Sequence, residues 1–261
     1  MTLDQITFEK VKEHPPIITK PEFLHTLSVH GYDVDLARKG LILANSIHNH
    51  NEGHMYNYGR RNLSYDEVFN LNEIIIAEDN SIRGASYAVG HLMPVTLCYL
   101  DHALRNNQRP SNEDLMAMIL HDALEDLHWN SPYFQPFKNK GMYLDDVVEK
   151  DLRNDIEEIT SDSFYIVDSL TKKPGNLYGD VEKLEHLASI NPNLVNYKFA
   201  DRLIGTRATM HQNKPKESLE KFPLRRSLNF LKFAYQNPEF VWPSFTKEFE
   251  EEIKILQEII Q

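Results

Sequence analysis

Apolar residues recur at helical spacing along most of this chain, and the clearest case is the segment 111–126. Ser111 and Asp114 have the types and the spacing of a helix N-terminus, a capping side chain and its partner three positions later. The apolar positions that follow share one face of a 3.6-residue turn: Leu115, Met118 and Ile119. The pattern predicts a helix that continues to the end of this segment.

The same spacing, with proline and glycine as breakers, predicts a chain made almost entirely of helices. The expected helices cover residues 34–49, 65–77, 94–105, two pieces within 142–170, 180–189, a segment after Pro192, 219–236 and 244–260. Loops are expected at 50–64 and 130–141, and a break at 172–176. Strands have little support, because the run 73–77 fits a helix equally well. We therefore expect an all-α fold.

No internal repeat, low-complexity tract or change of composition marks a domain boundary. A chain of 261 residues can bury a sizeable core as one domain. We expect a single domain over residues 1–261, with its helical core over about 35–235 and an inserted loop or helix near 50–82. The C-terminal helix, 244–260, should pack on that core through one apolar face.

Composition narrows the function classes. A net charge of −11 argues against binding of a nucleic acid polymer. Cys98 is the single cysteine, so an intrachain disulfide is impossible and a reducing compartment is favoured. Residues 1–20 lack the apolar stretch of a signal peptide, and no stretch has the length of a membrane span. We expect a cytoplasmic protein without a membrane partner, and its oligomeric state stays open.

Candidate chemistry begins where acidic residues extend an apolar helical face. His121 and Asp122 are adjacent, and Glu125 and Asp126 follow each of them by four residues, one helical turn. An unpaired buried carboxylate is costly, so this face needs a metal, a cation or several hydrogen-bond donors. The alternative is a charged helix end in solvent, which the two-letter motif by itself does not exclude.

Two other segments repeat this intrusion of polar groups. Lys198 and Asp201 fall on the apolar face of the helix after Pro192, where they form either a buried salt bridge or a metal ligand beside a phosphate-binding lysine. His91 lies at the entrance of an apolar helix, as a cap, a core residue or a ligand.

These groups together form a set of two imidazoles and two carboxylates: His91, His121, Asp122 and Asp201. Mixed nitrogen and oxygen ligands suit manganese, iron, zinc or cobalt better than calcium. An open coordination position would hold a water molecule and lower its pKa, which produces a nucleophile near neutral pH. The set predicts hydrolysis, most naturally of a phosphoester.

The order of these residues resembles the HD superfamily of metal-dependent phosphohydrolases. The closer likeness is to the hydrolase domain of the RelA/SpoT group and its small stand-alone relatives, which remove the 3′-pyrophosphate of (p)ppGpp. The likeness covers roughly residues 35 to 235, and its order and spacing are more specific than any single piece. The matching pieces are Ala44 with His48, 87–95 (tyrosine, then His-Leu-Met-Pro), 121–126 (HDxxED), 167–172 (ending in Leu-Thr-Lys) and 197–203 (KFADR).

The resemblance implies a single HD-domain helical bundle and a role for each matching residue. The implied ligands of one divalent ion, most simply Mn²⁺, are His91, His121, Asp122 and Asp201. The implied groups that orient or deprotonate the attacking water are Glu125 and Asp126. The implied supports of the site or the substrate are Lys198 and Arg202.

The departures from the family pattern fall on the substrate-facing side. Gly205 stands where the family has Asn, and Arg83 is the one basic residue where it has an Arg-Lys pair. Ser86 replaces a proline, Gly90 is an extra residue before His91, and the stretch 50–82 is longer. We expect metal-dependent hydrolysis to be retained, with Arg83 as a substrate contact and a substrate that differs from, or is broader than, guanosine tetraphosphate.

The leading hypothesis is a hydrolase of a phosphorylated nucleotide, such as a (p)ppGpp 3′-pyrophosphohydrolase with altered specificity. One alternative is a phosphatase or phosphodiesterase for a dNTP, NADPH or a cyclic nucleotide. Another is a non-catalytic nucleotide-binding HD module, which the complete ligand set disfavours. Further candidate phosphate contacts are Lys172 and Arg207, and residues that could reach the pocket mouth from a solvated loop are His50, His54 and Tyr56. Asp101, His102 and His211 are expected to be structural or on the surface.

Overall fold

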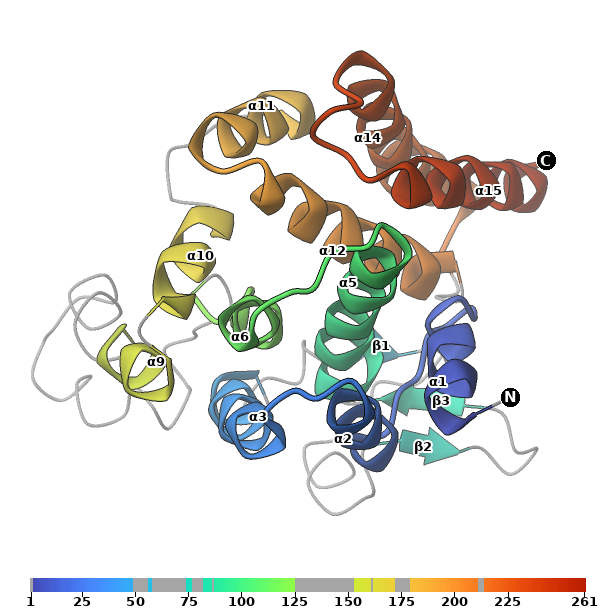
Figure 1. Cartoon of the computed structure of the whole chain (residues 1–261). Coiled ribbons are helices and arrows are strands. Elements are labelled where there is room, and N and C mark those ends of the chain that lie inside the picture. Colours follow the sequence, from blue (N-terminus) through green and yellow to red (C-terminus); the bar gives the residue numbers. More distant parts are fainter. Residues whose placement is uncertain are drawn as a thin grey trace, which may run out of the picture.

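The structure is a computed structural model, and it describes residues 2–48, 56–57, 74–76, 82–85, 87–124, 153–160, 162–171, 179–210 and 214–261. Helices make up most of these residues (Figure 1). In chain order they are α1 (Leu3–Val11), α2 (Lys20–Val29), α3 (Val34–His48), η2 (Ala88–Leu92), α5 (Met93–Arg105), α6 (Asn112–Leu120), α9 (Arg153–Ile159), α10 (Ser163–Leu170), α11 (Asp180–Ile190), α12 (Asn193–Met210), α13 (Lys216–Leu219), η4 (Glu220–Leu224), α14 (Arg225–Gln236) and α15 (Pro243–Ile260). The expected all-α class is confirmed.

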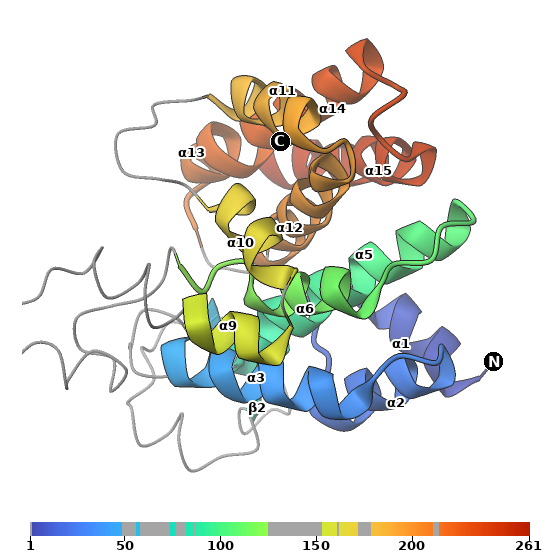
Figure 2. The same ribbon diagram turned by 60° about the vertical axis from the view of Figure 1, so that its left-hand side comes forward.

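The helices form three tiers. Helices α1, α2 and α3 lie on one side, α11, α14 and α15 lie on the other, and α5, α6, α10 and α12 lie between them (Figures 1 and 2). The middle tier joins the two sides, because α12 packs against α5, α11 and α15 while α6 packs against α3, α5 and α10. No described helix combines the length and the apolar character that a membrane span needs.

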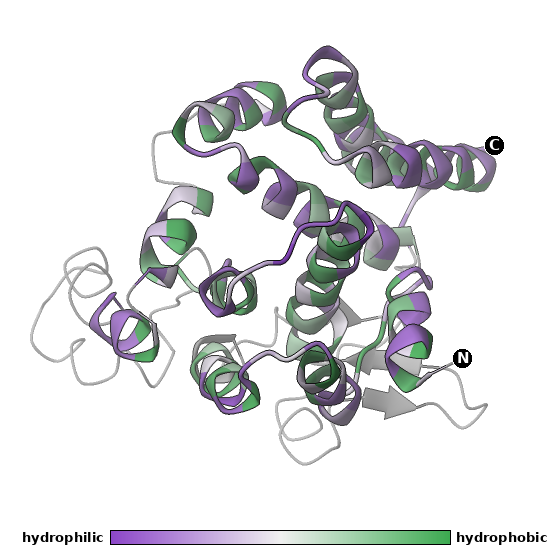
Figure 3. Ribbon diagram, viewed as in Figure 1, coloured by the Kyte–Doolittle hydropathy of each residue, from purple (hydrophilic) through white to green (hydrophobic). Residues whose placement is uncertain are grey.

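Amphipathic helices build the core. Most helices carry both hydrophilic and hydrophobic residues (Figure 3). The buried apolar residues of all three tiers form one cluster. The C-terminal helix α15 follows the expected pattern, because Phe249, Ile253 and Leu256 are buried against the core. Helix α12 is more deeply buried, and this position explains why polar residues on it need partners.

Local sequence signals placed several helices correctly. Ser111 caps α6 by accepting a hydrogen bond from the Asp114 backbone N–H at 3.1 Å, and the Asp114 carboxylate accepts one from the Ser111 N–H at 2.7 Å. Asn191 caps the start of α12 through its side chain, which accepts from Asn193 N–H at 3.0 Å. Pro94 lies in the first turn of α5, as expected. Helices α1 and α2, within the proline-containing N-terminal segment, were not predicted.

Two expectations about secondary structure are wrong. The helix predicted for 65–77 is a strand where the structure describes it, because Ile74–Ile76 is strand β2 of a small antiparallel sheet. In this sheet β3 (Ile82–Ala85) lies between β1 (Tyr56–Asn57) and β2. The three consecutive β-branched isoleucines of β2 favour a strand over a helix.

The second wrong expectation concerns the helix predicted to continue to residue 126. Helix α6 stops at Leu120, and a turn follows in which Ala123 N–H bonds to the Leu120 carbonyl.

A π-helical turn, η2, precedes α5 and contains Gly90. The Met93 N–H bonds to the Ala88 carbonyl five residues earlier, so the turn holds one residue more than an α-helix would. Pro94 has no N–H to donate to Val89, its partner five residues back. The Val89 carbonyl accepts instead from the Ile18 N–H at 3.3 Å. The π-helical turn therefore ends next to a proline, whose missing N–H makes the Val89 carbonyl available to Ile18.

A buried ion network joins α12 to α15 and to the end of α1. Arg207 is only 2% exposed, and its guanidinium donates to Glu252 at 2.5 Å, to Glu248 at 2.8 Å and to the Val11 carbonyl at 3.1 Å. Arg105 also contacts Glu248. Each of the three guanidinium nitrogens of Arg207 donates a hydrogen bond within the core. The expectation that Arg207 contacts phosphate is therefore wrong, and its role is structural.

Removing the guanidinium should leave two buried carboxylates without their main partner. We predict that Arg207→Ala lowers the free energy of unfolding by ~3–5 kcal/mol, the usual cost of breaking a buried pair from one side. Urea unfolding measures this. The matched control is Arg38→Ala, which removes an exposed pair with Asp35 and should cost less than ~1 kcal/mol. Equal losses in the two variants would contradict the assignment.

Candidate metal centre

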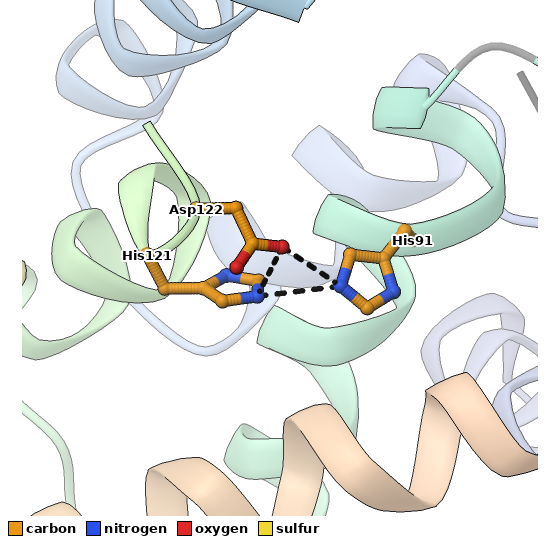
Figure 4. A group of neighbouring side chains, drawn as sticks. All are labelled: His91, His121 and Asp122. Carbon is orange, nitrogen blue, oxygen red and sulfur yellow. Dashed lines mark hydrogen bonds and ion pairs between the residues drawn. The ribbon is translucent and has the colours of Figure 1, made fainter. Parts of the chain in front are cut away.

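Three separate elements bring the predicted ligands together. His91 comes from η2, His121 and Asp122 from the turn after α6, and Asp201 from α12. Figure 4 shows the two imidazoles and the Asp122 carboxylate facing one another. Both histidines are almost fully buried, at 3% and 1% exposed. We refer to these four residues as the His–Asp cluster.

The distances within the His–Asp cluster suit ligands of one ion. The two imidazole Nε2 atoms are 3.3 Å apart, and the Asp122 Oδ2 lies 3.2 Å from that of His91 and 3.0 Å from that of His121. Ligand atoms held at roughly 2.0–2.2 Å from one metal are separated by about 3.0–3.5 Å. No further movement of these three side chains is needed to enclose a cation.

Asp201 stands next to both imidazoles but outside this tight group of three. Its Oδ1 lies 3.5 Å from His91 Nε2 and 3.7 Å from His121 Nε2. Its Oδ2 accepts a hydrogen bond from Lys198 at 2.9 Å. Both interpretations of Lys198 and Asp201 thus fit one geometry, because one oxygen is paired with the lysine and the other faces the imidazoles.

A second layer of contacts orients the ligands. His121 Nδ1 donates to the Met118 carbonyl at 2.7 Å, which leaves Nε2 as the nitrogen that faces Asp122. The Tyr87 hydroxyl donates to Asp122 Oδ2, and its ring packs on His91 with centroids 4.9 Å apart. Metal-binding histidines are commonly held in this way through their other ring nitrogen.

The cluster is electrostatically demanding. Burial alone would lower the pKa of His121, but the charge and hydrogen bond of Asp122, with help from Asp201, raise it to about 10. The pKa of His91 is also raised, against burial, by Asp122 and Asp201. Burial would raise the carboxyl pKa of Asp122 and of Asp201, but the imidazoles hold that of Asp122, and Lys198 with the imidazoles that of Asp201, well below the usual range. The two carboxylates therefore need positive charge beyond Lys198, which either protonated imidazoles or a divalent cation can supply.

A cavity of about 710 Å³ opens over the His–Asp cluster. Helix α12 forms one wall: between 198 and 210 its partly exposed positions all line this cavity, and they are Lys198, Asp201, Arg202, Gly205 and Thr209. Helices α10, α11 and α14 contribute the remaining charged positions, Asp168, Asp180, Lys183, His186 and Arg226. A cavity of this size accommodates a ligand as large as a nucleotide.

The predicted substrate residue Arg202 lines this cavity. Its guanidinium lies 5.8 Å from the centre of the Phe230 ring, and its Nε is buried without a hydrogen-bond partner in the described structure. Lys183 donates to the Leu170 carbonyl at 2.7 Å, and Arg226 lies 3.7 Å from Asp180. The sequence did not predict that Lys183 and Arg226 line the cavity, because their positions on α11 and α14 look like those of solvent-exposed residues.

The remaining predicted residues are not placed by the structure. Glu125 and Asp126 lie outside the described residues, as do Lys172, His50, His54 and His211. For Arg83 and Tyr56 only the backbone is described, in strands β3 and β1.

A second group of potential ligands, Asp101, His102 and Glu248, lies beside the Arg207 network. Arg105 contacts both of its carboxylates, so a guanidinium already supplies the positive charge there. His102 Nδ1 bonds to the Ser244 hydroxyl at 2.6 Å, and its ring stacks on Phe245. The geometry agrees with the structural role expected for Asp101 and His102.

No protein-family model, curated protein or solved structure matches this chain. The interpretation of the site therefore depends on its own geometry.

We predict that the His–Asp cluster binds one divalent ion per chain. Elemental analysis and calorimetric titration with Mn²⁺ should show one site in the wild type and its loss in His121→Ala, Asp122→Ala and Asp201→Ala. Asp101→Asn, in the second group, is the matched control and should keep the full stoichiometry. Stoichiometric metal in the Asp122→Ala and Asp201→Ala variants would rule out this ligand set.

Proposed function

We propose that this protein is a metal-dependent phosphohydrolase of the HD type that acts on a phosphorylated nucleotide. The observation that carries the proposal is the meeting of His91, His121, Asp122 and Asp201 at the base of a nucleotide-sized cavity. Three elements distant in sequence converge on this point, which a chance pair of adjacent His and Asp residues does not explain.

A divalent ion bound there would polarise a phosphoryl oxygen and lower the pKa of a bound water. The residues of the chain have distinct tasks around it. His121 is oriented by Met118, Asp122 by Tyr87, and Asp201 by Lys198. The Tyr87 ring also packs on His91. Lys198 also places a cation beside the site, where it can offset the charge of a phosphate.

The cavity supports an anionic substrate in a protein whose net charge is −11. Four cations line it, balanced by four carboxylates, so the cavity lining lacks the excess of negative charge of the whole chain. The cations are Lys183, Lys198, Arg202 and Arg226, and the carboxylates are those of Asp122, Asp168, Asp180 and Asp201. Among these cations, Arg202 is the best candidate for a contact with an anionic substrate, because no described carboxylate pairs with it.

The second candidate is a phosphatase or phosphodiesterase for a nucleotide other than guanosine tetraphosphate. Gly205 favours it, because an added Cβ there would meet nothing within 4 Å, so the side chain that would stand there in the RelA/SpoT group is replaced by open space. Charged and planar donors fix a phosphate and a base in register, and losing them costs discrimination more than chemistry.

We predict that Glu125→Gln keeps the fold and the metal but loses most turnover. The reason is its place in the stretch that matches HDxxED, where the resemblance implies that it orients or deprotonates the attacking water and is not a metal ligand. A positioned general acid or base contributes ~100-fold to 10,000-fold. Steady-state kinetics at saturating Mn²⁺ give the answer, with circular dichroism and metal content as controls. Turnover near that of the wild type would exclude this role.

The proposed activity is tested by a panel of ppGpp, NADPH, dNTPs and cyclic dinucleotides with added Mn²⁺, scored by released phosphate and pyrophosphate. We predict hydrolysis of at least one compound, and a kcat/KM for ppGpp that does not far exceed all others. A large preference for ppGpp would favour the plain alarmone hydrolase. Tight nucleotide binding without any turnover would favour a non-catalytic binding module, and the hydrolase proposal would fail.

A further inference from the structure

Gly205 occupies a position where a glycine has no structural advantage. It lies in the interior of α12, an 18-residue helix, where alanine is the more stable choice. Its backbone is helical, and a side chain at this point would enter open space. Neither a positive φ nor close packing requires the glycine.

Gly40 shows what a packing glycine looks like in the same molecule. A Cβ at Gly40 would stand 2.2 Å from Met116 Sδ, where α3 packs on α6. Met116 is itself buried, so any shift of its side chain would disturb the packing of the core. The two glycines are both in helices, and only Gly205 leaves its space unfilled by the protein.

The open space at Gly205 belongs to the large cavity. Gly205 follows Asp201 by four residues, about 6 Å along the axis on the same face. The walls from α11 and α14 bring apolar side chains to this cavity, including Leu184, Leu187 and Phe230. The group that fills the space is therefore a neighbour of whatever is bound at the His–Asp cluster.

The backbone at Gly205 offers little to a polar group. The Thr209 hydroxyl donates to the Gly205 carbonyl at 2.6 Å, in addition to the regular helical bond. What remains exposed is the Cα–H surface, a flat apolar patch. Such a patch gains from dispersion contact with a ring face and gains little from a phosphate or a hydroxyl.

We propose that Gly205 is a specificity-determining residue, against whose backbone the flat face of a substrate ring, a base or a sugar, packs directly. The inference rests on the proposed function and deepens it, because it defines the part of the nucleotide that lies one helical turn from Asp201. The absent side chain sets the size of the ring system that fits.

The test uses Gly205→Ala and Gly205→Leu in the full chain with bound Mn²⁺. Two probes are titrated by calorimetry: inorganic phosphate, which reaches only the metal end, and the tightest-binding nucleotide of the panel. We expect the Kd for phosphate to stay within about twofold and the Kd for the nucleotide to rise at least about tenfold in Gly205→Leu, the scale of a methylene mismatch in an apolar pocket.

Thermal unfolding separates this effect from a structural one. Gly205→Ala should raise the midpoint by about 2 °C, because alanine favours a helix interior, while nucleotide binding weakens. Gly40→Ala is the matched control and should lower the midpoint.

Unchanged nucleotide affinity in Gly205→Leu would overturn the inference. So would an equal loss for phosphate and nucleotide, which would indicate a damaged site. Binding is scored without turnover, so absent hydrolysis in the wild type would count against the proposed function alone.

Discussion

The buried ion network around Arg207 is the constraint on which the candidate site depends. Arg207 and Asp201 lie on the same helix, six residues apart, so they project from different sides of α12. The guanidinium binds Glu248 and Glu252 of α15 and the carbonyl at the end of α1, which fixes the rotation and the axial position of α12. In that register Asp201 lies 3.5 Å from His91 Nε2 and 3.7 Å from His121 Nε2. A charge network on another side of the helix thus holds the helix that carries Asp201.

This arrangement also explains why a helix with little amphipathic character lies in the centre of the molecule. Helix α12 packs against α5 and α11, is charged at Arg207 where α15 supplies carboxylates, and is open along the cavity between 198 and 210. Each charged residue on it either has a partner of opposite charge or lines the cavity. On this one helix, buried charges are therefore stabilised either by ion pairs within the protein or by access to the cavity.

The sequence correctly predicted the helices whose start signals lie within the helix or next to it. Caps at Ser111 and Asn191 and the proline at 94 gave helix starts within one or two residues, and the four cluster residues stood out because polar groups interrupted apolar faces. The sequence-based predictions were wrong where the role of a residue depends on a contact with a distant part of the chain. No sequence pattern near Arg207 indicates that Glu248 and Glu252 are its partners. A buried arginine was therefore interpreted as a phosphate contact. The cations Lys183 and Arg226 were missed for the same reason, since only the folded chain turns their helices toward the cavity.

The π-helical turn at 88–92 changes the direction of the side chains within it without changing the direction of α5. An extra residue in a regular α-helix would rotate everything on one side of it by about 100°. Here the slip is contained within one turn, and α5 continues unbroken into the core. Tyr87 and His91, on either side of Gly90, both end up facing Asp122. Adding or removing one residue in this turn would therefore change the directions of Tyr87 and His91, which contact Asp122, more than the course of α5.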